Sequence, residues 1–430
     1  MSHPAASAAQ PDQPSTTEAH LSFGGPIGAV VMMTMMPAVT IYLWVCVQLH
    51  GGALILPSGA DLRALPAPNL TALAWIAGFI AFQALLDVVL PGREYTGAPQ
   101  KDGRRRSYRL NGFASLVITL ALLAALLRSG VLHGTSAVAL LGPLLMTSIL
   151  LAYAIAAFLY VYGRREPAYE APQLHGAARF VYDYFMGTGL NPRIGRVDLK
   201  MFMESKVAMT GWLVLTLLMA HANYEKNGAL SLAMALVCAF QAFYVFDFFW
   251  FEEAMLSTWD INHENYGFML CFAFLTWMPF NFSLQSQYLV AADPQLSIAA
   301  VVGLIVLNFG GYYIFRTSNL QKHRFRNVPG TKIWGREPEY IETQRGTRLL
   351  ASGWWGLARH ANYLGDLMMA SAWCLTCGLG HLAPYFYFIY FAPLLIDRER
   401  RDDAHCARKY GADWQRYRAR VKWRILPFVY

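Results

Sequence analysis

Runs of apolar residues, separated by short polar stretches, dominate the pattern along this chain. A helix needs about 20 mostly apolar residues to cross a bilayer, and ten segments have or approach that length. They cover residues 26–49, 70–90, 112–127, 137–162, 207–222, 229–251, 266–284, 298–315, 364–379 and 381–396. The pattern therefore predicts an all-α integral membrane protein with about ten transmembrane helices. The last two segments are shorter than a full span, which predicts helices that are tilted or closely packed in protein.

Lysine and arginine are distributed unevenly between the predicted helices. Residues 92–110 contain six of them, whereas residues 51–69 contain only Arg63 and residues 285–295 contain none. Basic connections stay on the cytoplasmic side of a membrane. The other basic connections are residues 164–206, 316–359 and 398–424. Ten helices with both termini in the cytoplasm place all of these basic segments on the same side.

Composition agrees with lipid as the surrounding solvent. Of the 430 residues, 56% are hydrophobic and 14% are charged, and the formal net charge is +8. No basic face interleaved with aromatic residues accompanies that charge in the sequence, so we expect no nucleic-acid partner. Residues 1–22 are rich in Ala, Ser, Pro and Gln, which predicts a disordered cytosolic tail. Residues 23–430 are predicted to form a single multi-pass membrane domain.

Ionisable residues gather at the end of the apolar segment 229–251. Such residues are unfavourable at membrane depth and usually face a protein interior or a cavity. Tyr244 and Asp247 lie within the stretch F-Y-V-F-D-F-F-W, which favours a functional role for both. Residues that fit either a functional site or a solvated turn are Glu252, Glu253, Asp260, His263 and Glu264. Because glycine stands at position 267, His263 and Glu264 do not begin an H-E-x-x-H motif, and no metal site is predicted.

A second concentration of polar residues occupies the last third of the chain, between positions 316 and 417. Cations there could pair with phosphates, amides and carboxylates could bind hydroxyl groups, and aromatic rings could stack on a base. The mixture therefore suits a nucleotide. Attraction of the cations to anionic lipid headgroups is the alternative interpretation. The sequence has neither G-x-G-x-x-G after a strand nor G-x-x-x-x-G-K-[ST], so a nucleotide would have to bind between membrane helices.

Residues 349–366, L-L-A-S-G-W-W-G-L-A-R-H-A-N-Y-L-G-D, resemble the signature of the sterol reductase family. This family includes sterol C14-reductases, 7-dehydrocholesterol reductase, C24(28)-sterol reductases and the sterol-reductase half of lamin B receptor. The other similar stretches are residues 191–200 (N-P-R-I-G-R-V-D-L-K), 315–326, 401–417 and 424–430. Together they extend the resemblance over nearly all of residues 22–430, with a bacterial-type C14-reductase as the nearest pattern.

The resemblance implies NADPH as the hydride donor, a ten-helix fold and a cofactor pocket in the C-terminal half, about residues 207–430. By motif, Lys322 and Arg326 would bind the phosphates. The residues carried over to the rest of the nucleotide are Trp355, Asn362, Asp366, Arg398, Asp402 and Tyr417. An isolated alkene accepts hydride poorly, so an acid must also protonate it. Tyr244, Asp247 and Glu253 are the candidates for that acid or for a proton relay.

The implied reaction is reduction of a carbon–carbon double bond in a sterol that enters from the bilayer. Residues 252–261, E-E-A-M-L-S-T-W-D-I, resemble C14-reductases and predict the C14–C15 bond as the target. Ala273 and Phe274 stand where C14 and C7 relatives usually carry Gly-Asp, so reduction at C24 or C7 is an alternative. A catalytically silent receptor or scaffold is the alternative outside the enzymes. The membrane would be the inner membrane of a bacterium or the endoplasmic reticulum of a eukaryote.

Overall fold

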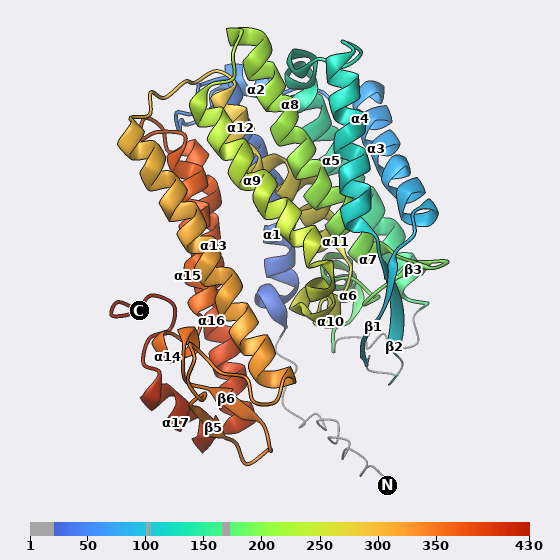
Figure 1. Cartoon of the computed structure of the whole chain (residues 1–430). Coiled ribbons are helices and arrows are strands. Elements are labelled where there is room, and N and C mark those ends of the chain that lie inside the picture. The colour runs from blue at the N-terminus through green and yellow to red at the C-terminus, as the bar shows by residue number, and fades with distance from the viewer. Residues whose placement is uncertain (1–20, 100–102, 104, 166–172) are drawn as a thin grey trace.

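The computed structural model of the chain is mostly helical (Figure 1) and describes residues 21–99, 103, 105–165 and 173–430. Of the predicted tail, residues 1–20 lie outside the described residues. Seven described helices are long and apolar enough to cross a membrane. They are Ser22–Gln48, Leu70–Val89, Gly134–Gly163, Leu199–Asn227, Leu232–Trp250, Phe268–Leu289 and Ile298–Asn327. This arrangement confirms the prediction of a helical multi-pass membrane protein.

The N-terminal two thirds of the chain form one bundle. Its uninterrupted helices are α1 (Gly25–Gln48), α3 (Leu70–Val89), α4 (Gly112–Arg128), α5 (Gly134–Gly163) and α9 (Leu232–Trp250). Two further helices contain π-helical segments: α7 (Leu199–Phe202), η2 (Met203–Met209) and α8 (Thr210–Asn227), then α11 (Phe268–Phe272), η4 (Ala273–Asn281) and α12 (Leu284–Leu289). The π segments η2 and η4 pack against each other at the centre of the bundle. Such widened turns often occur at functional sites.

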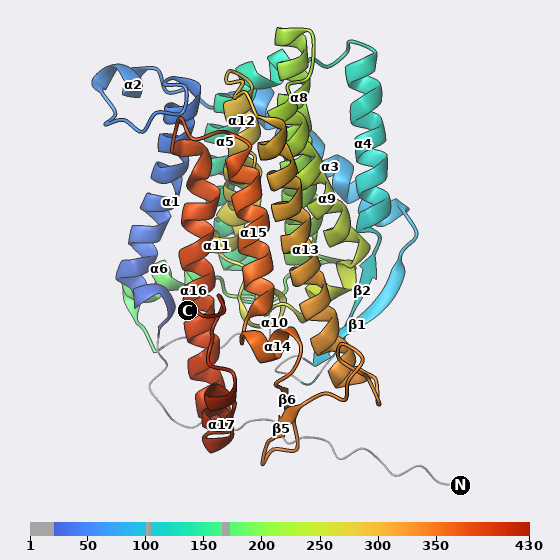
Figure 2. The same cartoon turned by 60° about the vertical axis from the view of Figure 1, so that its left-hand side comes forward.

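The C-terminal third contributes three long helices that lie side by side (Figure 2): α13 (Ile298–Asn327), α15 (Ala361–Leu375) and α16 (Phe386–Tyr410). Of these, α13 is among the seven candidate spans. The helix α15 has 15 residues and α4 has 17, both below the length of a full span. The count of ten transmembrane helices therefore stays a prediction.

The predicted ends of two helices in this third are wrong. The helix α13 runs to Asn327 instead of residue 315, and α16 runs to Tyr410 instead of residue 396. Arg, Lys, Glu and Ala are good helix formers, so both helices continue after the apolar pattern stops. Hydropathy marks where the apolar environment ends, whereas α16 ends where Gly411 adopts a φ of 53°.

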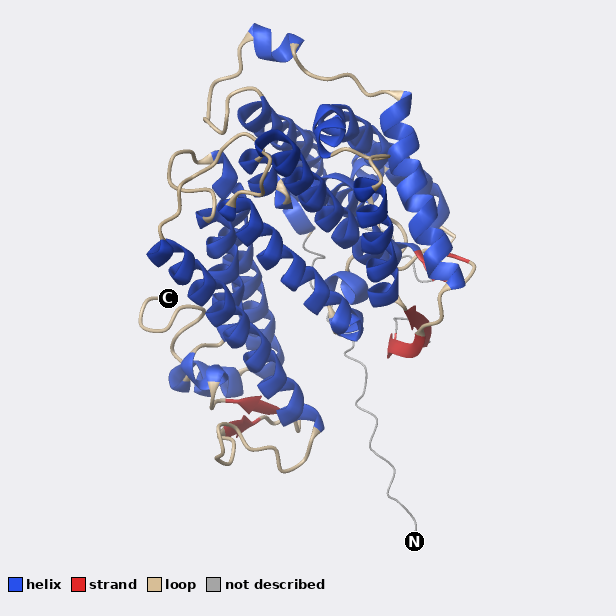
Figure 3. Ribbon diagram, turned by 45° about the horizontal axis from the view of Figure 1, so that its top comes forward, coloured by secondary structure: helices blue, strands red, loops and turns tan. Residues whose placement is uncertain are grey.

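Three two-stranded hairpins and several short helices complete the described part of the chain. The antiparallel hairpins pair β1 (Arg93–Pro99) with β2 (Arg105–Leu110), β3 (Arg193–Ile194) with β4 (Val197–Asp198), and β5 (Tyr340–Glu342) with β6 (Arg348–Leu350). The short helices are η1 (Ser22–Gly24), α2 (Gly59–Arg63), α6 (Gly176–Met186), η3 (Glu252–Ser257), α10 (Trp259–His263), α14 (Trp354–Leu357), η5 (Ala383–Tyr385) and α17 (Ala412–Arg420). All three hairpins lie at one end of the bundle (Figures 1 and 3), where the basic connections gather. The pattern of apolar runs along the chain does not predict these strands.

A close crossing of α13 and α15 fixes the C-terminal helices to each other. A Cβ atom placed on Gly365 would lie 2.5 Å from the Gly311 carbonyl oxygen and 2.6 Å from the Phe315 nitrogen. A Cβ atom on Gly311 would lie 2.7 Å from the Gly365 carbonyl oxygen. The two backbones can therefore approach this closely only because both residues are glycine.

Substituting Gly365→Val will force α13 and α15 apart. Overpacking of this kind typically destabilises a protein by about 1–3 kcal/mol, so we expect a lower midpoint of thermal unfolding in detergent. The control is Gly303→Ala on the partner helix α13, where an added Cβ meets no atom within 4 Å. Equal melting temperatures for Gly365→Val and the control would show that this crossing does not limit stability.

Candidate active site

The eight residues predicted to bind a cofactor come from five helices that pack together at one end of the C-terminal third. The helix α13 carries Lys322 and Arg326, and α14 carries Trp355. The remaining residues are Asn362 and Asp366 on α15, Asp402 and Arg398 on α16, and Tyr417 on α17. The contacts of α13 with α14 and α15, of α14 with α15, and of α16 with α15 and α17 bring these helices together. The eight residues span almost 100 positions in the sequence, and folding gathers them in one region (Figure 2).

A cation–π contact joins Lys322 to Trp355 in this region. The Lys322 Nζ atom lies 4.0 Å from the centre of the Trp355 ring. The Trp355 indole donates a hydrogen bond of 2.7 Å to the Ser318 carbonyl oxygen, and the Trp355 carbonyl oxygen accepts one of 3.4 Å from the Tyr417 hydroxyl. The indole N–H and the carbonyl oxygen of Trp355 are therefore both hydrogen-bonded inside the protein. Trp355 acts as a rigid support that fixes the position of the Lys322 ammonium group.

The donors and acceptors of this region fit a nucleotide. Lys322 and Arg326 are four residues apart on α13, so their charges lie on one face of the helix. The Asn362 Oδ1 atom is buried and has no hydrogen-bond partner among the described residues. A buried amide oxygen without a partner is unfavourable, so a ligand that donates a hydrogen bond would stabilise it. Cations for phosphates thus lie near an acceptor for a hydroxyl or carboxamide group.

A buried ionic cluster fastens the C-terminal tail beneath the same helices. The carboxylate of Glu399 on α16, which is fully buried, accepts a hydrogen bond of 2.9 Å from Arg424 and lies 3.8 Å from the Arg359 guanidinium. The tail is also held by backbone bonds from Arg359 to Trp423 and from His360 to Arg424. Because this cluster anchors residues 359–360, it also fixes the start of α15, which carries Asn362.

The three residues predicted to supply a proton occupy different surroundings. Asp247 on α9 accepts a hydrogen bond of 2.8 Å from the Tyr312 hydroxyl and forms an ion pair with Arg316, both on α13. These two contacts hold the Asp247 carboxylate against α13. Glu253 lies in η3, beyond the end of α9, beside Glu252.

Tyr244 faces the C-terminal helices. Its ring lies 5.4 Å from the Trp373 ring of α15 and 5.9 Å from the Trp212 ring of α8. Its strongest electrostatic interaction is with Asp366 on α15, followed by that with Asp247. Asp366 in turn interacts with Arg398 of the predicted cofactor set. The helices α9 and α15, which carry Tyr244 and Asp366, also pack against each other.

Sequence reasoning missed two residues that hold Asp247, namely Tyr312 and Arg316. Arg316 belongs to a basic connection and to the polar concentration of residues 316–417, and it lies on α13 with its guanidinium 3.8 Å from the centre of the Phe251 ring. Aromatic neighbours and a carboxylate at membrane depth could have indicated a partner cation, but the sequence does not give the rotation of one helix against another. His360, which lies 3.6 Å from Asp402, was also left outside the predicted site.

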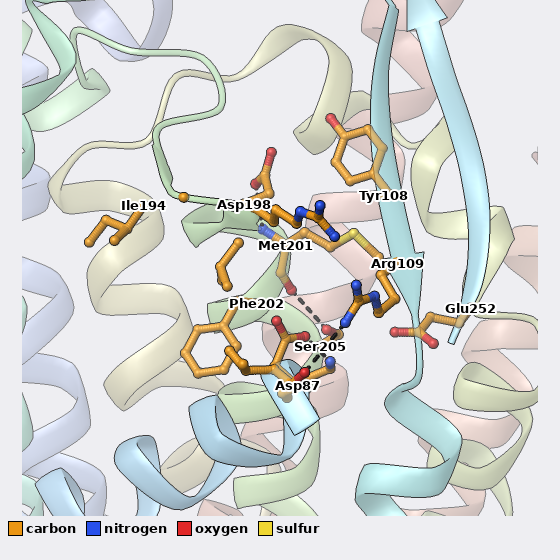
Figure 4. A pocket seen from close by; sticks show the side chains of 14 residues that line it. Asp87, Tyr108, Arg109, Ile194, Asp198, Met201, Phe202, Ser205 and Glu252 are labelled. Atoms are coloured by element: carbon orange, nitrogen blue, oxygen red, sulfur yellow. Dashed lines mark hydrogen bonds and ion pairs between the residues drawn. The ribbon is translucent and has the colours of Figure 1, made fainter. Parts of the chain in front are cut away.

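Two cavities lie away from this region. One, of about 430 Å³, sits under the β1–β2 and β3–β4 hairpins (Figure 4), where Asp87, Arg109, Asp198 and Glu252 are among the residues that line it. Lys206 at its base pairs with Asp87 and donates to the Asn111 side chain. Burial raises the pKa of Glu252 to about 7.

The second cavity, of about 780 Å³, is apolar and lies between α3, α4, α5, α8 and η4. None of the predicted site residues lines either cavity. Both belong to the N-terminal two thirds of the chain, on the other side of the bundle from α13, α15 and α16 (Figure 1). The candidate active site is therefore defined by the residues that converge on the C-terminal helices.

Long apolar helices, with ionisable residues gathered between them at one end, define a multi-pass integral membrane protein that carries its polar site on helices. The model of the Ergosterol biosynthesis ERG4/ERG24 family matches residues 17–430, and the chain belongs to this family. The match confirms the resemblance to sterol reductases that the motifs indicated.

Relatives from a bacterium, an animal and a plant are similar over most of their length. The chain is 44% identical to the Delta(14)-sterol reductase of Methylotuvimicrobium alcaliphilum, covering 95% of this chain and 96% of the relative. It is 40% identical to Delta(14)-sterol reductase TM7SF2 of Mus musculus, over 96% of this chain and 99% of the relative. It is 38% identical to the Delta(14)-sterol reductase of Arabidopsis thaliana, over 84% and 97% respectively.

The protonation of His360 gives this region a predicted pH dependence. Burial, together with the smaller effect of the positive charges of Lys322, Arg359 and Arg424, lowers the pKa of His360 from 6.5 to about 3. Asp402 offsets this little, because its side chain is 50% exposed and solvent screens it. Between pH 6.5 and about 3 the unfolded chain binds a proton that the folded chain does not. The stabilisation is therefore fully present above pH 6.5 and is lost as the pH falls.

We expect His360→Asn to flatten the decline in stability on acidification, by up to about 1.4 kcal/mol per pH unit below pH 6.5. Thermal unfolding of both proteins between pH 7.5 and pH 5 measures this difference. Other titrating groups contribute equally to both proteins, so the difference between the two curves isolates His360. Parallel curves would contradict a buried neutral imidazole.

Proposed function

We propose that this protein is an NADPH-dependent sterol reductase that reduces the C14–C15 double bond. Membership of the family supports sterol chemistry, and the relatives named above are all Delta(14)-sterol reductases. The observation that carries the proposal is that Lys322, held 4.0 Å from the centre of the Trp355 ring, and the unpartnered Asn362 oxygen lie on the packed helices α13 and α15, and that α15 also packs against α9, which carries Tyr244. This packing joins a proton-bearing hydroxyl among apolar helices to residues suited to a nucleotide.

Cofactor binding is assigned to the residues of α13 to α17. Lys322 and Arg326 would hold phosphate groups, and Asn362, with its unpartnered oxygen, would accept a hydrogen bond from the nucleotide. Asp366, Arg398 and Asp402 would surround the rest. When bound, NADPH supplies a hydride. These residues of α13 to α17 would keep the hydride-donating end of the nucleotide next to Tyr244 and away from water.

Tyr244 is the group that we assign to protonate the alkene. Asp247 is tied to Arg316 and Tyr312, so it suits a positioning role better than that of a proton donor. The Tyr244 oxygen would give its proton to one alkene carbon, bound NADPH would supply hydride to the other carbon, and the tyrosine would regain a proton from solvent.

The substrate is proposed to reach Tyr244 from the bilayer, since a sterol dissolves in lipid rather than in water. The basic connections gathered at one end of the bundle support cytoplasmic termini and a cytoplasmic nucleotide site. Ala273 and Phe274, which replace the usual Gly-Asp, begin the π segment η4, and Phe274 packs 5.9 Å from the Tyr266 ring. This position therefore contributes packing and no carboxylate, which leaves protonation to other residues.

Product analysis by mass spectrometry tests the proposed substrate. Purified protein supplied with NADPH and sterols unsaturated at C14, C7 or C24 should saturate only the C14 bond. Turnover of the C24 or C7 sterol alone would contradict the C14 assignment and keep a sterol reductase. No turnover of any sterol by a protein that binds NADPH would favour a silent receptor of the same family.

Replacing Tyr244→Phe tests the proton donor. We expect kcat to fall by about 10²–10⁴-fold, because general acid catalysis typically contributes that much, while the dissociation constant for NADPH stays unchanged. The matched control is Tyr313→Phe on the exposed face of α13, which should retain activity. Full activity of Tyr244→Phe would rule out Tyr244 as the acid.

A further inference from the structure

The ion pair between Asp260 and Arg398 joins the N-terminal bundle to the C-terminal helices. Asp260 lies in α10, and its Oδ2 atom is 3.7 Å from the Arg398 Nη2 atom on α16. Arg398 also interacts electrostatically with Asp366 on α15. Its guanidinium can therefore serve the cofactor region only if α10 holds Asp260 in place. A helix of five residues does not have the internal hydrogen bonds to hold itself in one position.

A buried lysine caps this short helix. The Nζ atom of Lys200 donates to the carbonyl oxygens of Asp260 at 2.6 Å, Glu264 at 2.7 Å and Ile261 at 3.2 Å. An ammonium group has three donors, and three carbonyls at the C-terminal end of α10 accept them. Positive charge is also favourable at a helix C-terminus. Lys200 is thus fully used inside the protein and has no donor left for a ligand.

Asn191 supports the same helix end. Its Nδ2 atom donates to the Ile261 carbonyl oxygen at 3.2 Å. Asn191 and Lys200 are the first and last residues of the stretch N-P-R-I-G-R-V-D-L-K, whose resemblance to the family carried no site residue. Between them, the β3–β4 hairpin turns the chain so that both side chains reach α10.

Carboxyl groups surround the Lys200 ammonium group and offset the unfavourable burial of its charge. Asp198, Glu204, Asp260 and Glu264 all act on it electrostatically. Glu204, in η2, is itself influenced by Asp260 and Arg398. A buried charge needs such compensation, so removing one member should disturb the others.

We propose that Lys200 is a positioning residue for the cofactor site. By holding the end of α10, it orients Asp260, and Asp260 orients Arg398 toward the nucleotide. The proposal rests on the proposed function, because it takes Arg398 as part of an NADPH site. It assigns to the stretch 191–200 a role in cofactor affinity without direct contact with the cofactor.

The test uses full-length protein in detergent and two variants, Lys200→Met and Asp260→Asn. We expect each to raise the dissociation constant for NADPH by about threefold to tenfold, with little change in kcat at saturating cofactor. Neither should weaken binding further when combined with Arg398→Gln, since all three act on one path. Lys226→Met, an exposed lysine on α8, is the matched control and should bind NADPH normally.

Hydrogen exchange separates this proposal from the proposed function, because it needs no cofactor. Lys200→Met should speed exchange in α10 and also in α16 around Arg398, and not in α5. Faster exchange confined to α10, or unchanged NADPH affinity in a folded Asp260→Asn protein, would overturn the positioning role. If Lys200→Met does not fold, the Asp260→Asn result alone decides. Failure of the wild-type protein to bind NADPH would instead reject the proposed function.

Discussion

Burying charge between apolar helices is unfavourable unless the charge is paired, and this constraint organises the polar end of the protein. Asp247 on α9 pairs with Arg316 on α13, and Lys206 on η2 pairs with Asp87 on α3. Lys200 instead binds three carbonyl oxygens of residues 260–264. Each of these interactions joins segments that are distant in the sequence. Removing one partner would leave a charge without compensation, so these pairs fix helix positions as well as neutralise charge.

The candidate site follows from those fixed positions. The α13–α15 crossing at Gly311 and Gly365 sets the spacing of the helices that carry Lys322 and Asp366. The pair of Asp247 with Arg316 places α9, and with it Tyr244, against α13 and α15. A row of packed helices then carries Tyr244 on α9, Asp366 on α15, Arg398 on α16 and Lys322 on α13. An apolar substrate region and a charged nucleotide region can meet along this line, which is what reduction of a lipid alkene requires.

Much of the fold and part of the site could be predicted from sequence for physical reasons. Apolar runs report the membrane environment directly, so the helical class was predictable. Helix ends were not, because Arg and Lys extend α13 and α16 beyond the apolar boundary. The cofactor residues were proposed from motifs, and folding brings them to one set of packed helices.

Partners across helices could not be predicted from sequence. Nothing in the chain order shows that Arg316 meets Asp247, or that Lys200 reaches the carbonyls of α10, because both depend on how helices are rotated and tilted in space. The sequence equally does not show that the buried Asn362 Oδ1 atom lacks a hydrogen-bond partner among the described residues, because this depends on what surrounds the residue. Sequence patterns thus indicate which residue types are available, and tertiary packing decides which of them meet.

Isotope transfer tests whether the protein reduces a sterol double bond with a hydride from NADPH and a proton from solvent. A sterol unsaturated at C14 would be incubated with the protein and NADPH deuterated at its transferable hydrogen, and in a second reaction with unlabelled NADPH in heavy water. We expect one deuterium in the product of each reaction, and the two reactions should label adjacent carbons of the former double bond. A product without deuterium from the labelled NADPH, or no product at all, would contradict reduction by hydride and proton at this site.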